Sequence, residues 1–358
     1  MTEHYHTYQG QHRFWHVLGD PLGDRRIKLA EPRDAVLWFD RRCFAAEEPL
    51  LAELGGLGMT RIPAVYEKEP GGGSAPPGRR LLVQDFIPGT TLAEVSAPGA
   101  PVADQHLSDI EERFRQLASV RAADVRTERT CAERERAENG DTGRFFSTLV
   151  AFTRREGYRR HRGTYGPLFR ALGVPRRPLT PRARPAREAG DFTSRPFCLL
   201  HGDLHRANFI VDASDQRLWT IDWELAMLGD PLYDLATHLY LMQYPAAQEE
   251  EVTERWRRAV SGVLPGADAG WRDDLPRYLA YKRAQSVFTD VVRHAQKLVT
   301  ADPGERRVRL KETGETVHAL LRRAADVLGP AYVPEPEDVA AAYRAHVLGA
   351  VRRPRGRR

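Results

Sequence analysis

The feature that most constrains this chain is a pair of short polar segments set between apolar runs near its middle. The first, HGDLHRAN at 201–208, lies between FCLL and FIV, and the second begins at Asp222, where the run RLWTID ends. Short apolar runs rich in Phe, Leu, Ile and Val are typical of buried strands, and the polar residues between them form loops. The sequence therefore predicts strand, loop and strand, with Asp203 and Asn208 in the loop and Asp222 at the end of a further strand.

These three polar residues are of the types that phosphoryl transfer requires. A triphosphate needs a divalent cation to neutralise its charge, and Mg²⁺ prefers hard oxygen ligands. Asn208 and Asp222 supply an amide oxygen and a carboxylate. A separate carboxylate must take the proton of the acceptor hydroxyl, and Asp203 suits that role. The pattern predicts a catalytic base at Asp203 and a Mg²⁺ site at Asn208 and Asp222.

Other polar residues in these segments have quieter interpretations. His201 is expected to hold the loop through backbone hydrogen bonds, and His205 to lie near the acceptor without an assigned role. Glu224 is equally compatible with contact to a metal or substrate and with a salt bridge at the surface. A zinc site at His201, Asp203 and His205 would explain neither Asn208 nor the second segment, so we set it aside.

The second segment leads into a helix. Asp230 followed by Pro231 has the pattern of a helix cap and first helical residue. Asp234, within the first turn, is expected to brace the catalytic loop rather than to touch substrate.

The first 86 residues have the pattern of short strands and turns around one helix. An apolar helical pattern covers 44–54, where Pro49 indicates that the regular helix begins late. Runs bounded by Gly, Pro or Asp predict strands at 14–19, 26–31, 35–40 and 81–87.

Helical patterns dominate after Pro88 and Gly89. Residues 144–161 continue such a pattern, and the chain from the second polar segment to about residue 348 is expected to be helical. Two pairs have the spacing of a capping box, Thr91 with Glu94 and Ser108 with Glu111.

The charge of the chain does not indicate a nucleic-acid surface. The formal net charge is +5, but the last seven residues, RRPRGRR, hold five arginines, so the first 351 residues sum to zero. An Arg/Pro-rich stretch at 174–188 has five arginines and one glutamate, which leaves −4 for the rest. We expect a disordered tail at 349–358, an insertion or flap at 174–188, and no nucleic-acid partner.

The chain also lacks the marks of a membrane or secreted protein. No apolar run approaches the roughly 20 residues of a membrane helix, and the N-terminus has no basic start followed by an apolar stretch. Three cysteines, Cys43, Cys131 and Cys198, lie far apart without metal-like spacing. We therefore expect a cytoplasmic protein without membrane insertion.

Taken together, the two polar segments resemble the catalytic and metal loops of the aminoglycoside phosphotransferase and choline kinase family of small-molecule kinases. The family's pattern His-x-Asp-x-x-x-x-Asn occurs at His201, Asp203 and Asn208. Its metal-loop aspartate matches Asp222, and its Gly-Asp-Pro…Asp run matches 229–234. The resemblance implies an α+β, protein-kinase-like bilobal fold, with a small N-terminal antiparallel β-sheet lobe with one helix and a larger, mainly helical C-terminal lobe.

The resemblance also implies ligands and lobes. The cofactors would be ATP or GTP and Mg²⁺, and the second substrate a small hydroxylated acceptor. The implied divisions are a nucleotide-binding lobe at 1–86, a catalytic and acceptor-binding lobe at 87–348, and the tail at 349–358. The loop GDPLGD at 19–24 would cover the phosphates. The segment LLVQDFIPGTTL at 81–92 resembles the family's connector between the two lobes. Its backbone groups would meet the adenine edge at Gln84, Phe86 and Ile87.

In this family a lysine on the third strand binds phosphate and pairs with a glutamate on the next helix, for which Glu47 aligns best. The strand at 35–40 is third in the predicted order, and the expected position holds Trp38. Either Lys28 on the preceding strand supplies the charge, or an arginine at 41 or 42 does, or the site is impaired. We favour Lys28.

The leading hypothesis is a kinase that moves the γ-phosphoryl group of ATP or GTP to a hydroxyl of a small molecule, such as an antibiotic or a related natural product. Mixed charges at 249–274 favour a neutral or zwitterionic acceptor over a polycationic one. The main alternative is a nucleotide-binding pseudokinase with a scaffolding or regulatory role. Trp38 favours that alternative, and the intact polar segments oppose it. Nucleotidyl transfer is a third hypothesis.

Overall fold

The structure is a computed structural model whose helices and strands form two compact units. It describes residues 4–9, 13–19, 26–32, 41–68, 81–175, 192–329 and 332–351. The first unit comprises Met1–Trp38, Arg42–Gly140 and Arg195–Ala269. The second comprises Phe39–Arg41, Asp141–Ser194 and Gly270–Arg358. The predicted lobe boundary at residue 86 lies inside the first unit, so the division into lobes stays a prediction.

Several predicted features lie outside the described residues. They are the strand at 35–40 with Trp38, the loop at 20–24, residues 176–188 of the Arg/Pro-rich stretch, and the tail beyond residue 351.

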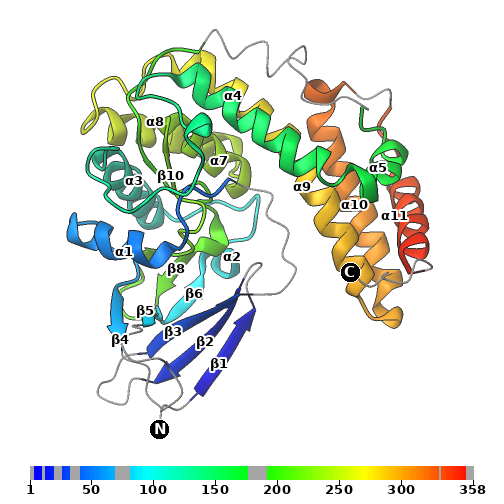
Figure 1. Ribbon diagram of the computed structural model, residues 1–358, viewed down its shortest axis with the longest axis horizontal. Coiled ribbons are helices and arrows are strands. Elements are labelled where there is room, and N and C mark those ends of the chain that lie inside the picture. Colours follow the sequence, from blue (N-terminus) through cyan, green and yellow to red (C-terminus); the bar gives the residue numbers. More distant parts are fainter. Residues whose placement is uncertain are drawn as a thin grey trace. The chain divides into compact units, whose positions relative to one another are not determined.

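A five-stranded antiparallel sheet opens the first unit (Figure 1). Its strand order is β1-β2-β3-β5-β4, with β1 His4–Gln9, β2 Arg13–Gly19, β3 Arg26–Pro32, β4 Val65–Lys68 and β5 Leu81–Asp85. The register sets Lys28 of β3 opposite Val17 of β2 and Gln84 of β5. Directly opposed residues project from the same face of a sheet. Lys28 and Gln84 therefore share one face.

This sheet corrects the strand order expected from the sequence. β1 precedes the first predicted strand, so β3 is the third strand of the described sheet. Lys28 consequently lies on the third strand, where the family resemblance places a lysine. The sequence HYHTYQ does not predict β1 because its His, Tyr and Gln residues show no clear apolar alternation.

Helix α1, Glu47–Gly56, packs against β4 and β5 through its buried leucines. It begins later than the apolar pattern suggested, as Pro49 indicated. As the third residue of the helix, Pro49 removes an N–H that has no partner within the helix. The carboxylates of Glu47 and Glu48 lie in the first turn, where the helix dipole favours negative charge.

Two smaller sheets carry the polar segments. Strand β7, Cys198–Leu200, pairs with β10, Met227–Gly229. The other sheet has the order β6-β8-β9, formed by Gly89–Thr91, Phe209–Asp212 and Leu218–Thr220. The loop 201–208 thus joins β7 to β8, and Asp222 follows β9. The predicted strand-loop-strand arrangement is confirmed.

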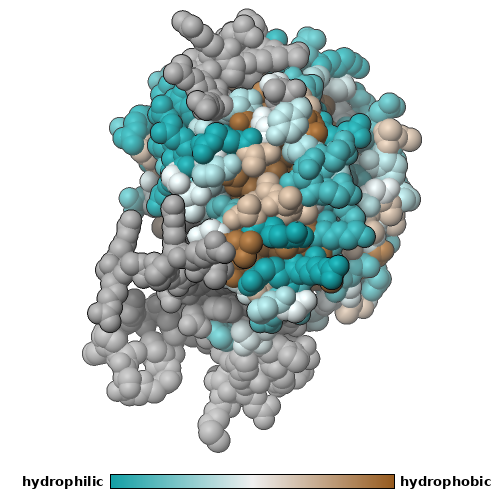
Figure 2. All heavy atoms as spheres, turned by 90° about the vertical axis from the view of Figure 1, so that its right-hand side faces the viewer, coloured by the Kyte–Doolittle hydropathy of each residue, from teal (hydrophilic) through white to brown (hydrophobic). Residues whose placement is uncertain are grey.

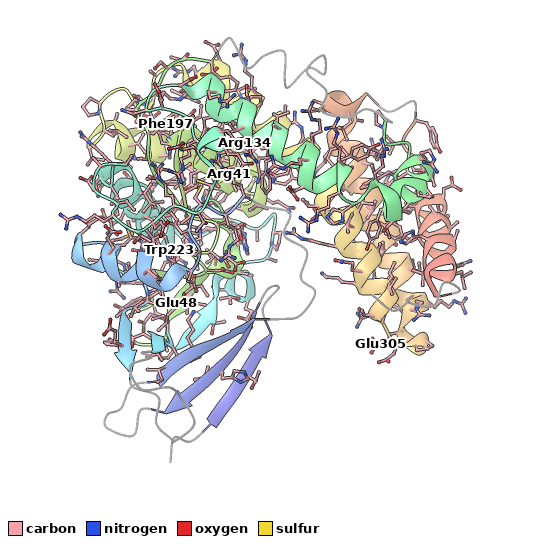
Figure 3. All side chains as sticks on the ribbon, viewed as in Figure 1. Arg41, Glu48, Arg134, Phe197, Trp223 and Glu305 are labelled. Carbon is pink, nitrogen blue, oxygen red and sulfur yellow. The ribbon has the colours of Figure 1, made fainter. Side chains whose placement is uncertain are left out.

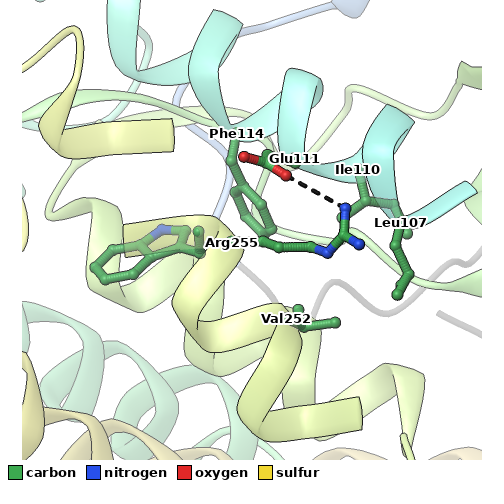
Figure 4. A pocket seen from close by; sticks show the side chains of 7 residues that line it. Leu107, Ile110, Glu111, Phe114, Val252 and Arg255 are labelled. Carbon is green, nitrogen blue, oxygen red and sulfur yellow. Dashed lines mark hydrogen bonds and ion pairs between the residues drawn. The ribbon is translucent and has the colours of Figure 1, made fainter. Parts of the chain in front are cut away.

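Four α-helices of the first unit surround these strands: α2 Leu92–Val95, α3 Asp104–Ser119, α7 Pro231–Met242 and α8 Ala246–Ser261. Helix α7 is buried along most of its length. The capping box of Thr91 and Glu94 is present at α2. The one expected at Ser108 is wrong, because α3 already begins at Asp104. Its partner Glu111 instead faces Arg255 of α8 beside a small pocket (Figure 4).

The second unit is helical. It contains α4 Thr142–Phe152, a π-helix Thr153–Arg159, α5 Arg162–Ala171, α9 Trp271–Thr300, α10 Pro303–Leu328 and α11 Pro336–Val351. Helix α10 packs against both α9 and α11. The face that carries α10 and α11 is largely hydrophilic, with a smaller apolar patch (Figure 2). Within the described residues, no helix combines the length and apolar character needed to cross a membrane.

Gly89 allows β6 to approach β8. A Cβ atom at residue 89 would lie 2.1 Å from the carbonyl oxygen of Val211 and 2.8 Å from Cγ2 of Ile210. Gly89→Ala should therefore lower the free energy of unfolding by roughly 1–3 kcal/mol, measured by urea denaturation. Gly55→Ala in α1 is the control, because nothing lies within 4 Å of its added methyl group. The control should match the parent or gain up to about 1 kcal/mol, and equal losses in both variants would show that the close approach of β6 to β8 does not require glycine.

Candidate active site

The loop that follows β7 is anchored by the carboxylate of Asp234 on α7. The backbone N–H of His201 donates to Oδ2 of Asp234 at 2.9 Å, and that of Gly202 donates to Oδ1 at 2.8 Å. Gly202 has φ +82°, and a Cβ there would lie 2.6 Å from the carbonyl oxygen of Leu225. Only glycine fits this position without strain. Asp234 thus braces the loop, as predicted.

His201 locks the loop to the second segment. Its Nε2 donates to the carbonyl of Ile221 at 3.1 Å, and its Nδ1 accepts the N–H of Asp203 at 3.3 Å. Burial lowers the pKa of His201 to about 3, so the ring stays neutral near pH 7. A neutral ring with both nitrogens engaged has the structural role that the sequence predicts.

Asp203 and Asn208 lie in direct contact. The side-chain Nδ2 of Asn208 donates to the backbone oxygen of Asp203 at 2.9 Å and to its Oδ2 at 3.2 Å. Nε2 of His205 lies 3.4 Å from the same Oδ2. The side chain of Asp203 is 29% exposed. It is therefore both oriented by neighbours and open to an incoming molecule.

Asp222 follows β9 in a strained conformation beside this loop. Its φ is +65°, which non-glycine residues seldom adopt and which is enriched at functional sites. The preceding residue, Ile221, donates its N–H to the carbonyl of Asn208 at 3.0 Å. The two polar segments are thus joined by backbone hydrogen bonds, and Asp222 lies next to Asn208.

The electrostatics of Asp222 show which charged groups surround it. Burial raises the pKa of Asp222 well above its usual value, and Lys28 opposes that rise. Lys28 therefore lies within electrostatic range of Asp222. Three neighbouring carboxylates raise the pKa further, those of Glu224, Glu47 and Asp203. Negative charge predominates here, and a cation would stabilise the ionised form of the site.

Glu47 ties the sheet to the second segment. Its Oε1 accepts from Nε2 of Gln84 at 2.8 Å, and its Oε2 accepts from the backbone N–H of Trp223 at 2.7 Å. Figure 3 marks Trp223 and Glu48, the neighbours in sequence of Asp222 and Glu47. Gln84 shares the sheet face of Lys28, so that face is directed toward α1. The structure brings Lys28, Glu47 and Asp222 into one cluster.

The alternative cations at 41 and 42 have other contacts. Arg41 belongs to the second unit, is buried, and donates from Nη1 to Oγ1 of Thr148 at 3.3 Å. Arg42 donates to the carbonyl of Ala45 at 3.1 Å. These contacts favour Lys28 over either arginine as the phosphate-binding residue.

The remaining predicted residues are placed as follows. Phe86 and Ile87 are half-buried in the connection between β5 and β6. The side chain of Gln84 is buried and directed to Glu47, so only its backbone is available for the predicted adenine contact. The nucleotide contacts of all three residues stay predictions. Glu224 contributes to the negative charge around Asp222.

Asp230 caps α7 as predicted and has a second partner that the sequence did not indicate. Its Oδ1 accepts the N–H of Leu232 at 3.0 Å. Arg195 donates to its two carboxylate oxygens at 2.9 and 2.7 Å, and both side chains are fully buried. Breaking a buried pair of this kind leaves an uncompensated charge, so the pair fixes the start of α7.

Two supporting residues escape prediction from the sequence. Arg206, buried in the loop, donates to the carbonyl oxygens of Met242, Ser96 and Ala100. Nδ1 of His238 donates to the carbonyl of Leu204 at 3.0 Å, so its Nε2 accepts from the hydroxyl of Tyr244 at 2.9 Å. Arg206 could have been suspected from its place inside the motif. His238 looks like any histidine of an apolar helix.

The donor set fits Mg²⁺ better than a softer metal. Within the described part of the chain, no three His, Cys, Asp or Glu side chains are grouped to hold a metal ion. A cation between Asn208 and Asp222 would instead combine one amide oxygen, one carboxylate and oxygens of a bound phosphate. Hard oxygen ligands completed by substrate phosphates are typical of Mg²⁺.

A sequence comparison identifies the family. Residues 10–273 match the phosphotransferase enzyme family, and this match spans more than half of the chain. The chain belongs to this family. The match includes both polar segments and the strand that carries Lys28. Among curated proteins, none gives a significant match.

Solved structures support the fold. A proposed aminoglycoside phosphotransferase from Ralstonia eutropha is 14% identical, covers 96% of this chain and 92% of its own, and has a TM-score of 0.51. A choline/ethanolamine kinase family protein from Mesorhizobium loti is 17% identical, with coverages of 96% and 92% and a TM-score of 0.47. Spectinomycin phosphotransferase in complex with ADP and spectinomycin is 12% identical, with coverages of 95% of this chain and 92% of its own and a TM-score of 0.45. The family match and the Ralstonia structure together confirm the protein-kinase-like α+β fold.

The neutral state of His238 predicts how stability depends on pH. Burial lowers the pKa of His238 from 6.5 to about 3. The unfolded chain therefore takes up a proton that the folded chain does not, so the stability that His238 contributes is complete above pH 6.5 and is lost between pH 6.5 and 3. The loss should reach about 2 kcal/mol by pH 5. Urea unfolding of wild type and His238→Gln at pH 7.5 and 5 should show a smaller pH effect in the variant, whereas equal effects would contradict the assignment.

Proposed function

We propose that this protein transfers the γ-phosphoryl group of a nucleoside triphosphate, ATP or GTP, to a hydroxyl group of a small molecule. The observation that carries the proposal is the convergence of Asp203, Asn208 and Asp222 on two hydrogen-bonded loops. In a chain of the phosphotransferase enzyme family, these residues have the chemistry that this reaction needs.

Asp203 would act as the base. Its carboxylate is partly exposed and is oriented by Asn208, so an acceptor hydroxyl can reach it. The hydroxyl oxygen bonds to the γ-phosphorus as the bond from phosphorus to the β,γ-bridging oxygen breaks. Asp203 takes the hydroxyl proton, and the nucleoside diphosphate leaves with the bridging oxygen.

Asn208 and Asp222 would hold Mg²⁺, which neutralises charge on the phosphate oxygens when bound. The strained backbone of Asp222 sets the direction of its carboxylate before any ligand arrives. The hydrogen bond between Ile221 and Asn208 keeps the two ligands at a constant separation. Because of these contacts, Asn208 and Asp222 would need little rearrangement when Mg²⁺ and the nucleotide bind.

Lys28 would bind the α- and β-phosphates, and Glu47 would position both Lys28 and the metal loop. Lys28 is on the third strand, on the face directed to α1. Backbone groups at Gln84, Phe86 and Ile87 would receive the adenine or guanine edge. We expect the protein to act in the cytoplasm, where triphosphates and Mg²⁺ are available.

The acceptor we propose is neutral or zwitterionic, such as an antibiotic or a related natural product. Arginines alternate with carboxylates on α8, where Arg255 pairs with Glu251 and Arg257 with Glu254. Carboxylates neutralised in this way are poor ligands for a polycation. The alternative of a pseudokinase loses its main support, since Lys28 occupies the third strand.

The reaction can be tested by mass spectrometry. Purified protein, ATP or GTP and Mg²⁺ would be incubated with a panel of hydroxylated antibiotics, nucleosides, sugars and amino alcohols. We expect one acceptor to gain the mass of one phosphate. Gain of a nucleotide would instead establish nucleotidyl transfer, and nucleotide binding without any product would favour the pseudokinase.

Asp203→Asn keeps the shape of the side chain but removes the proton acceptor. The turnover number should fall by roughly 10²–10⁴ while nucleotide affinity is largely retained. Asp222→Ala is the contrasting variant, because it should weaken the Mg²⁺-dependent part of nucleotide binding measured by calorimetry. Normal turnover in a folded Asp203→Asn protein would exclude Asp203 as the base.

Lys28→Met keeps most of the side-chain length and deletes the charge. Loss of a partly desolvated contact to phosphate should cost roughly 2–4 kcal/mol in transition-state stabilisation, or about 30- to 1000-fold in kcat/KM. Arg42→Met is the matched control, because that side chain donates to the backbone of Ala45. Normal kcat/KM in Lys28→Met together with loss in Arg41→Met would transfer the role to Arg41.

A further inference from the structure

His205 has two separate contacts within the catalytic loop. It precedes the short 3₁₀-helix Arg206–Asn208, and its Nδ1 accepts the N–H of Ala207 at 3.2 Å. A nitrogen that accepts a hydrogen bond carries no proton, so the neutral ring must be protonated at Nε2. The first contact therefore determines what the other side of the ring can do.

The other side of the ring faces the proposed base. Nε2 of His205 lies 3.4 Å from Oδ2 of Asp203. A small rotation of either side chain brings this separation to hydrogen-bond length, and such contacts often tighten when substrate binds. Because the contact with Ala207 leaves the proton on Nε2, this nitrogen is a hydrogen-bond donor that faces the Asp203 carboxylate.

Two donors thus converge on one oxygen of Asp203. Nδ2 of Asn208 lies 3.2 Å from Oδ2, and Nε2 of His205 lies 3.4 Å from the same atom. The backbone of Asp203 is separately held by His201 and Asn208. Both donors therefore act on the rotation of the carboxylate about its own side-chain bonds.

We propose that His205 is a positioning residue that fixes the orientation of the Asp203 carboxylate toward the acceptor hydroxyl. This inference rests on the proposed function, in which Asp203 is the base. The side chains of His205 and Asp203 are each 29% exposed, so both are open to an incoming acceptor. The competing interpretation is that His205 only caps the 3₁₀-helix.

Two substitutions separate the contacts of His205. His205→Gln places an amide N–H near the former Nε2 and gives up the cap. His205→Asn keeps a short side chain that caps a helix start well but does not reach Asp203. We expect kcat to fall roughly ten- to a hundredfold in His205→Asn, with the KM for ATP unchanged. His205→Gln should lose at most about threefold in kcat.

The two variants give opposite results under the competing interpretation. If the cap is what matters, His205→Gln is the damaged variant and His205→Asn is nearly normal, and this result overturns the proposal. Equal loss in both variants, or none in either, also overturns it. Urea unfolding of both proteins identifies any loss that arises from instability of the fold.

A second measurement does not depend on activity. In protein labelled with ¹⁵N-histidine and held near pH 8, the His205 resonances are those that disappear in His205→Gln. We expect the Nε2–H tautomer, with a proton resonance that shifts in Asp203→Asn. The Nδ1–H tautomer, or a resonance indifferent to Asp203→Asn, would overturn the proposal. If no acceptor is phosphorylated, the proposed function fails while this contact is still tested.

Discussion

The carboxylate of Asp234 is the interaction on which the candidate site depends. It accepts the backbone N–H groups of His201 and Gly202 from a helix that is buried along most of its length. Without these hydrogen bonds, two buried N–H donors would be left unsatisfied, and each would lower the stability of the fold by about 1–3 kcal/mol. Moving Asp234 would require repacking α7 against the core. The start of the loop that carries Asp203 is therefore anchored to the core, which suits a group that must meet a substrate at a set distance.

Glu47 performs the equivalent task for the second polar segment. One of its oxygens holds Gln84 in the sheet, and the other holds the N–H of Trp223, beside Asp222. The carboxylate of Glu47 thus connects strand β5, which pairs with β3, to the second polar segment, which would bind metal. This arrangement extends the role expected from the sequence, in which Glu47 only pairs with a lysine. A change at Glu47 should disturb both the phosphate side and the metal side of the site.

The sequence indicates the residues that we propose for the chemistry more readily than the residues that support them. Asp203, Asn208 and Asp222 stand out in the sequence because phosphoryl transfer needs a base and hard oxygen ligands, and these three residues are of those types. Asp230 and Asp234 could be found from local helix-cap chemistry and the family pattern. His238 and Arg195 could not, because their partners lie 34 and 35 residues away in the sequence. The capping box expected at Ser108 failed for a related reason, since its spacing also recurs inside helices.

Lys28 shows how strongly a functional conclusion can depend on the order of strands. Because the tract HYHTYQ does not predict β1, the sequence places Lys28 on the second strand, whereas it lies on the third strand of the described sheet. With Trp38 at the third-strand position, the absence of a lysine there would favour an inactive protein. The register of β3 with β5 reverses that argument, because it sets Lys28 beside Gln84 on the face directed to Glu47. Alternation of apolar residues detects strands that bury a face, whereas β1 is joined to the described sheet only through β2 and can form with few apolar residues. The position of a residue within a sheet is therefore a property of the whole lobe, and local sequence patterns do not determine it.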